Sequence, residues 1–111
     1  MIRIGPSGWT HPALDRAWPL QRGVDFDPLN FLGQFFGAVE VDVTAHVLPR
    51  EEHIVRWAAA LQGRPRTRLL VRVPSTILDL SRAPEERAAD AGRFRDSIAP
   101  LVRRERLGGL V

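Results

Sequence analysis

Short β-rich runs alternate with longer helical runs along this chain, and this alternation restricts its fold more than any other feature. The expected strands cover residues 2–5, 38–43 and 68–73, and residues 108–111 read as a turn and the first residues of a fourth strand. Strand and helix in alternation at this spacing is typical of right-handed parallel crossovers. We therefore expect an α/β protein built on a parallel sheet.

Three helices are expected between these strands. The first begins at Asp27, an N-cap followed by a first-turn proline, and repeats apolar residues at helical spacing up to Gly37, which can end it in the left-handed conformation. The second begins near Pro49 and the third near Pro84. A kink is expected in the third helix at Pro100, because proline removes a helical hydrogen bond.

The parallel pattern favours a (β/α) barrel of the TIM type over a doubly wound sheet. The first βα turn lacks a G-x-G-x-x-G motif and the chain has no P-loop. A complete barrel of this type has about 250 residues, whereas the chain has 111. We therefore expect one partial domain over residues 1–111, truncated relative to a whole barrel and holding the first three βα units and the start of strand four.

The composition narrows the kinds of chemistry open to the chain. It has no cysteine, which excludes disulfides, thiolate zinc sites and cysteine nucleophiles. It has no lysine or tyrosine either, so all 16 basic residues are arginine, and a net charge of +3 is enough to raise the pI to 11.2. The basic pI is therefore weak support for a nucleic-acid partner. No apolar stretch of about 18 residues and no secretory signal is visible, so a cytoplasmic protein without a membrane segment is expected.

The second expected strand carries charged side chains where a barrel has its interior. Three valines share one face of this strand, and the polar residues that share the other face, with one two residues further on, are Glu40, Asp42, Thr44 and His46. The outer face of a barrel strand packs under helices and is apolar. The valines are therefore expected to face the helices and the carboxylates to face the interior, where an ionised group needs a partner or a ligand.

The neighbouring strands can supply those partners. The same alternation turns Arg3 and Arg72 toward the interior. One interpretation is a closed ion network that fills the barrel, in which Glu40 and Arg3 take part. The other interpretation is a ligand site, because Asp42 and Arg72 lie near the carboxyl ends of their strands, where barrel enzymes have their active sites.

The loop after the first strand is expected at the same end of the barrel, where the carboxyl ends of the strands lie. Ser7 and Trp9 are expected at the mouth, with backbone amides around Gly8 available to an anion, although Trp9 could equally pack against the end of the barrel. His11 and His53 are interpreted as loop and surface residues. The candidate ligand-binding residues are thus Ser7, Trp9, Glu40, Asp42, Thr44, His46 and Arg72.

A divalent metal is an alternative that the residues leave open. Glu40, Asp42 and His46 suit zinc or manganese, but one strand rarely supplies a whole site. We therefore assign no metal ligand, and the cofactor stays unknown. No Ser-His-Asp arrangement can be argued from spacing and no G-x-S-x-G motif is present, so the residues alone name no reaction.

These motifs resemble the YecE-like family, domain of unknown function 72. The shared stretches are Gly5-Pro6-Ser7-Gly8-Trp9, then residues 39–44 (VEVDVT), Leu48-Pro49, and Arg72-Val73-Pro74. The chain departs from the family pattern at four positions. Asp42 replaces an asparagine, His46 stands where an aromatic is common, Arg72 replaces a lysine, and Asp79 falls where a histidine would be.

The resemblance implies a (β/α) barrel of about twice this length without an established activity. We expect a small anionic or sugar-like ligand at the carboxyl-end mouth of the completed barrel, with the fragment inactive alone. The alternatives are a nucleic-acid-binding or metal-dependent endonuclease- or isomerase-like barrel, and a non-catalytic truncated product. Because an open sheet exposes its edges, self-association is also expected.

Overall fold

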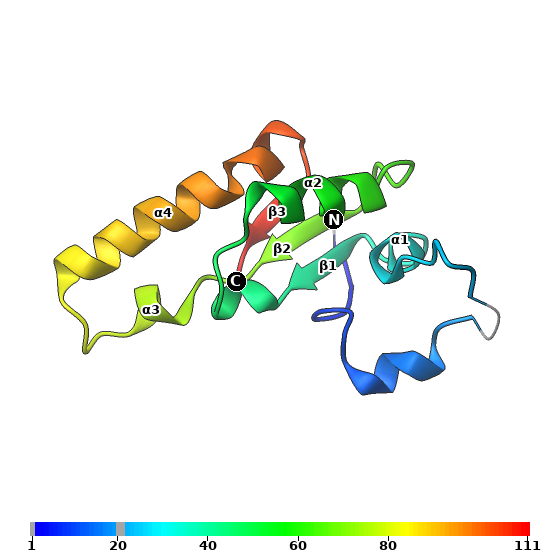
Figure 1. Ribbon diagram of the computed structural model, residues 1–111, viewed down its shortest axis with the longest axis horizontal. Helices are drawn as coiled ribbons and strands as arrows, with labels where there is room; N and C mark the ends of the chain where they lie inside the picture. Colours follow the sequence, from blue (N-terminus) through cyan, green and yellow to red (C-terminus); the bar gives the residue numbers. More distant parts are fainter. Residues whose placement is uncertain (1, 20–21) are drawn as a thin grey trace.

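The structure is a computed structural model that describes residues 2–19 and 22–111. In chain order its elements are η1 (Pro12–Arg16), α1 (Pro28–Leu32), β1 (Ala38–Val41), η2 (Val43–Ala45), α2 (Glu51–Ala60), β2 (Arg68–Val71), α3 (Ser75–Leu78), α4 (Pro84–Arg103) and β3 (Leu107–Leu110), where η marks a 3-10 helix. The three strands form one parallel sheet in the order β1-β2-β3 (Figure 1). The expected α/β class with a parallel sheet is confirmed.

The sheet has one face that packs under helices and one that does not. Val39, Val41, Leu69 and Val71 are completely buried. They form a core with apolar residues of α1, α2 and α4, namely Leu29, Leu32, Ile54, Ala60, Phe94, Ile98 and Leu101. On the other face Glu40 and Leu70 are only half buried. The predicted alternation is therefore confirmed for β1 and β2.

The expected strand over residues 2–5 is wrong. Ile2 is 90% exposed and Ile4 73% exposed, and the chain pairs with β1 only further on. There the N–H of Glu40 donates to the carbonyl of Pro6 at 2.9 Å and the N–H of Gly8 donates to the carbonyl of Glu40 at 2.8 Å. Pro6 has no N–H to extend this ladder, so the segment contributes one bridge, Ser7 to Glu40, and no strand.

The first helix and the two following strands are shorter than expected. α1 ends at Leu32 and continues as turns, and Gly37 does not adopt a positive φ, so the predicted left-handed helix end is wrong. β1 ends at Val41 because the chain then turns into η2, which leaves Val43 48% exposed. β2 ends at Val71, and α3 follows it without having been expected from the sequence.

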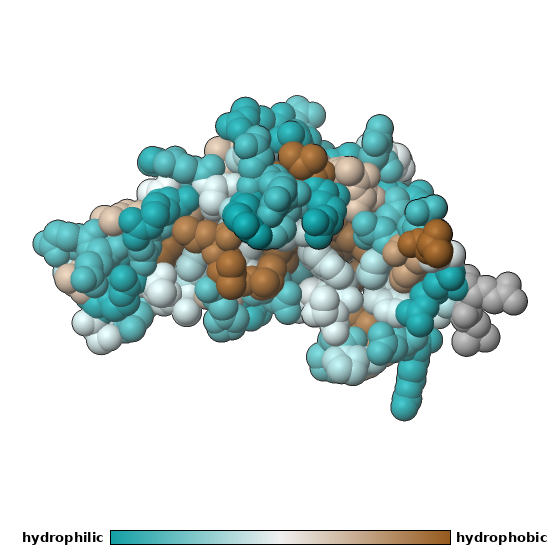
Figure 2. Space-filling view, viewed as in Figure 1, coloured by the Kyte–Doolittle hydropathy of each residue, from teal (hydrophilic) through white to brown (hydrophobic). Residues whose placement is uncertain are grey.

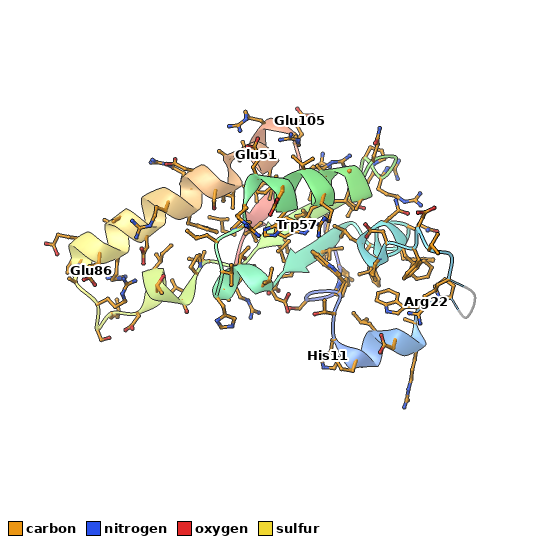
Figure 3. The ribbon with its side chains drawn as sticks, in the orientation of Figure 1. His11, Arg22, Glu51, Trp57, Glu86 and Glu105 are labelled. Carbon is orange, nitrogen blue, oxygen red and sulfur yellow. The ribbon has the colours of Figure 1, made fainter. Side chains whose placement is uncertain are left out.

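The carboxyl-terminal third agrees more closely with the prediction from the sequence. α4 starts at Pro84, as expected, and runs through Pro100 to Arg103. A tight turn containing Glu105, labelled in Figure 3, then leads into β3. β3 pairs in parallel with β2, with a bulge between Leu69 and Leu70. The predicted start of a further strand is thus confirmed, and it lies beside β2.

Charged groups join α3 to α4. The guanidinium of Arg82 contacts the carboxylate of Asp90 and donates to the carbonyl of Thr76 at 2.9 Å. Arg93 is also paired with Asp90, and Nε of Arg87 donates to the carbonyl of Ile77 at 2.8 Å. The amino-terminal half of α4 contains no buried residue before Phe94. These polar contacts therefore hold this arm, which extends away from the sheet in Figure 1.

We expect the contribution of this cluster to stability to depend on pH. The hydrogen bond from Arg82, with help from Arg93 and Thr76, lowers the pKa of Asp90 to about 2. A carboxyl whose pKa is lower in the folded state stabilises the fold above its ordinary pKa of about 3.9 and loses this effect as the pH falls toward 2. Urea unfolding should therefore show Asp90→Asn less stable than the parent at neutral pH. The difference should close between pH 4 and about pH 2; a difference that stays constant would contradict this interpretation.

Candidate functional site

Glu40 and Arg72 meet on the uncovered face of the sheet. Nη2 of Arg72 lies 2.7 Å from Oε1 of Glu40, and the side chains are 47% and 18% exposed, respectively. Oε1 of Glu40 is buried, and its positively charged partner in this contact is Arg72. The expected inward direction of both residues is consistent with this pair. Of the two arginines expected on this face, Arg72 reaches the carboxylate, and no ion pair of Arg3 is found among the described residues.

A hollow of about 330 Å³ lies beside this carboxylate. Three of its lining residues are polar and the others are apolar residues or glycine. The lining consists of Arg3, Ile4, Gly5, Pro6, Ser7, Ala38, Glu40 and Leu70. Ser7 is exposed and lies at the bridge to Glu40. Arg3 therefore belongs to the same surface as Glu40, although it does not form an ion pair with it. The hollow offers one negative and one positive side chain and a hydroxyl to a ligand.

Asp42 lies next to the backbone of Gly8. Gly8 has a φ of 73°, and a Cβ built on it would come within 2.8 Å of both carboxylate oxygens of Asp42. The N–H of Gly8 already donates to the carbonyl of Glu40. An anion site on the Gly8 amide is therefore not supported, because that amide is engaged and a carboxylate lies beside it.

Thr44 and Trp9 are integrated into the packing of the protein. Thr44 is completely buried, and its hydroxyl lies 3.0 Å from the carbonyl of Val41 and 2.7 Å from that of Arg72. It therefore links the carboxyl ends of β1 and β2. Trp9 packs edge-on against Trp57 of α2 with ring centroids 6.2 Å apart, and Trp57 lies on the side of α2 that faces the sheet (Figure 3). This contact fits the interpretation in which Trp9 is a packing residue, rather than the one in which it lines the mouth of a ligand site.

His46 belongs to a different hollow from Glu40. It is exposed and lines a space of about 220 Å³ together with Leu48, Pro74, Thr76 and Asp90. Figure 2 shows hydrophobic side chains gathered in this region, between α4, α3 and the segment that follows β1. The structure thus brings together Ser7, Glu40 and Arg72, with Asp42 close to Gly8, and separates His46 from their hollow.

The remaining histidines make local contacts. Nδ1 of His11 accepts the N–H of Ala13 at 3.1 Å, and Nδ1 of His53 accepts the N–H of Arg50 at 3.1 Å. His53 also stacks on Trp57. Within residues 2–19 and 22–111, no three acidic or histidine side chains gather in a group that could hold a metal ion.

Three parallel strands, helices packed on one face and a polar, half-exposed opposite face define a partial βα protein. The chain belongs to the family described as "Protein of unknown function DUF72", whose model matches residues 3–111. This is the YecE-like family, so the resemblance is confirmed. No curated protein matches the chain, and no helix among the described residues is long and apolar enough to cross a membrane.

Two crystal structures of a DUF72 family protein from Enterococcus faecalis V583 share the fold. The one at 3.10 Å resolution has a TM-score of 0.67 at 23% sequence identity. The one at 2.52 Å resolution has a TM-score of 0.63 at 20% identity. Each match covers 99% of this chain and 38% of the other chain, so the chain spans well under half the length of these relatives.

Proposed function

We propose that the chain contributes part of a (β/α) barrel whose interior binds a small anionic or sugar-like ligand. The parallel order β1-β2-β3 and the packing of helices on one face support a barrel, which needs eight strands. The coverage of only 38% of a related chain is consistent with further strands elsewhere. A second chain could also supply them at the exposed edge of β3, which is the proposed basis for self-association.

One observation carries the ligand proposal: Glu40 lines the hollow while its carboxylate is paired with the 47% exposed guanidinium of Arg72. A carboxylate accepts hydrogen bonds on both of its oxygens, so Glu40 can accept one from a ligand hydroxyl while it is paired with Arg72. Arginine is suited to bind the carboxylate or phosphate of the same ligand, because its guanidinium donates two parallel hydrogen bonds. Arg3 and Ser7 on the wall of the hollow add a second cation and a hydroxyl. A hydroxylated anion such as a sugar phosphate or a sugar acid fits this set.

Titration calorimetry with a panel of sugar phosphates and sugar acids tests the proposal. We expect at least one member to bind and Arg72→Ala to weaken its binding at least about tenfold, because that change removes the anion contact. Glu40→Gln should weaken the same ligand, since the amide cannot accept hydroxyl hydrogen bonds with a full negative charge. The matched control is the exposed pair Arg50 and Glu52, whose charged groups are 3.0 Å apart. Its variants Arg50→Ala and Glu52→Gln should bind normally. Binding that survives both Arg72→Ala and Glu40→Gln would refute the assignment.

A further inference from the structure

Arginine side chains gather at the amino ends of the strands, opposite the rim that carries Arg72. Arg64 and Arg66 lie in the loop between α2 and β2, and they line a hollow of about 610 Å³ with residues 33–37 of the loop before β1. Arg66 also lines a second hollow of about 800 Å³, together with Arg3. The two hollows share Phe35, Phe36, Gly37 and Arg66. We call this surface the arginine groove.

The positive charge of the arginine groove is not neutralised by the described residues. No acidic residue lines either hollow. The ion pairs among residues 2–19 and 22–111 involve other arginines, and Arg3, Arg64 and Arg66 take part in none of them. In addition, Nε of Arg64 is buried without a hydrogen-bond partner. A cluster of unpaired guanidiniums raises the local concentration of anions and favours a bound polyanion.

Two further arginines fix the loop that presents this charge. Nη1 and Nη2 of Arg106 donate to the carbonyls of Arg64 and Leu61 at 3.0 and 3.1 Å. Nη1 of Arg68 donates to the carbonyl of Pro65 at 2.6 Å. The loop is therefore held from the starts of β2 and β3 by two arginine side chains that donate to three backbone carbonyls. Holding a cationic loop in place lowers the entropy lost when it binds.

An exposed aromatic ring lies between the arginines. Phe35 lines both hollows and is 66% exposed, which is unusual for a phenylalanine. Its ring is supported edge-on by Phe31, with centroids 5.2 Å apart. A supported aromatic face among arginines is the arrangement on which unpaired bases stack, while the guanidiniums contact the phosphates.

We propose that the arginine groove binds single-stranded nucleic acid. A single strand provides both phosphates and free base faces, whereas an acidic peptide or an anionic membrane would leave Phe35 without a stacking partner. A duplex hides its base faces and would not enter a hollow of this size. The groove shares Arg3 with the hollow beside Glu40, but Arg64, Arg66 and Phe35 do not line that hollow. Variants at Arg66 and Phe35 therefore test this inference separately from the proposed ligand site.

Fluorescence anisotropy with a labelled oligothymidylate of about 15 nucleotides tests the inference on the full chain. We expect binding that weakens as salt rises from about 50 to 200 mM, with a log–log slope of about two for three phosphate contacts. Arg66→Ala should weaken binding several-fold and lower the slope by about 0.7, because one phosphate contact is lost. Arg95→Ala is the matched control, since Arg95 is 80% exposed on α4 outside the groove, and it should leave affinity and slope unchanged.

Phe35→Leu separates stacking from charge. The leucine keeps an apolar side chain beside Phe31 but removes the aromatic face, so affinity should fall about tenfold with the salt slope unchanged. Thermal unfolding of each variant checks that the fold is intact. Three results would overturn the inference: no binding at low salt, binding that neither Arg66→Ala nor Phe35→Leu changes, or a free thymidine nucleotide that binds as tightly as the strand.

Discussion

Leu69→Ala is expected to lower the free energy of unfolding by about 2–5 kcal/mol. Leu69 is completely buried at the centre of the sheet, between β1 and β3, and belongs to the core formed with α1, α2 and α4. Alanine removes most of this side chain, and the surrounding strands cannot close the resulting cavity completely. Since small domains have a total stability of about 5–15 kcal/mol, this change would remove a large share of it.

Leu70→Ala is the matched control for this experiment. Leu70 is the next residue of the same strand, but it points to the uncovered face and is only half buried. Its truncation should cost about 1 kcal/mol or less, because little apolar surface returns to water. Urea unfolding of both variants measures the contrast. Similar losses for Leu69→Ala and Leu70→Ala would show that both faces of the sheet are equally packed, contrary to the structure.

The alternation of side chains explains why the central part of the fold could be predicted. In β1 and β2 every second residue is branched and apolar, and a strand directs such residues to one face. This periodicity correctly predicted that Val39 and Leu69 pack under helices and that Glu40 and Arg72 face away. The periodicity failed at Val43, because the chain leaves the sheet after Val41. The hydroxyl of Thr44 then donates a hydrogen bond back to the carbonyl of Val41.

The amino-terminal segment shows that alternation cannot predict whether a segment pairs with its neighbouring strand. Ile2, Arg3 and Ile4 follow the same pattern as the true strands, but their pairing with β1 is decided by the residues after them. Pro6 cannot donate, and Gly5 contacts the backbone of Ala38 too closely for any side chain to fit. Alternation also assigns faces without giving the reach of a side chain, so it could not decide which of Arg3 and Arg72 would pair with Glu40; the structure pairs Glu40 with Arg72.

The arginine groove could not be inferred from the sequence for a related reason. Its residues come from the amino terminus, the loop before β1 and the loop before β2, and their proximity depends on the parallel order of the strands. Arg64 and Arg66 stand out in the sequence as a short cluster, but Arg3 and Phe35 do not. Arg3 and Ile4 line both the groove and the hollow beside Glu40, so the two proposed sites adjoin at the amino-terminal segment, whereas Arg64, Arg66 and Phe35 belong to the groove alone.

Gly5→Ala is expected to destabilise the protein by about 1–3 kcal/mol, as overpacking of a closed contact does. A Cβ on Gly5 would overlap the carbonyl oxygen of Ala38, and this atom belongs to the backbone of β1, so it cannot move aside as a flexible side chain would. We expect the segment to separate from β1 locally. Gly23→Ala is the control, because no atom lies within 4 Å of a Cβ built there.

Hydrogen exchange can show where the Gly5→Ala change acts. The N–H of Glu40 donates to Pro6 and that of Gly8 donates to Glu40, so both amides should exchange faster when the segment separates. The N–H of Arg72, which donates to Val41 between β1 and β2 at 3.2 Å, should keep its protection. Because Ser7 and Arg3 would leave the hollow beside Glu40, Gly5→Ala should also weaken any ligand bound there. Unchanged exchange at Glu40 and Gly8 would mean that the segment does not depend on the close contact of Gly5 with Ala38.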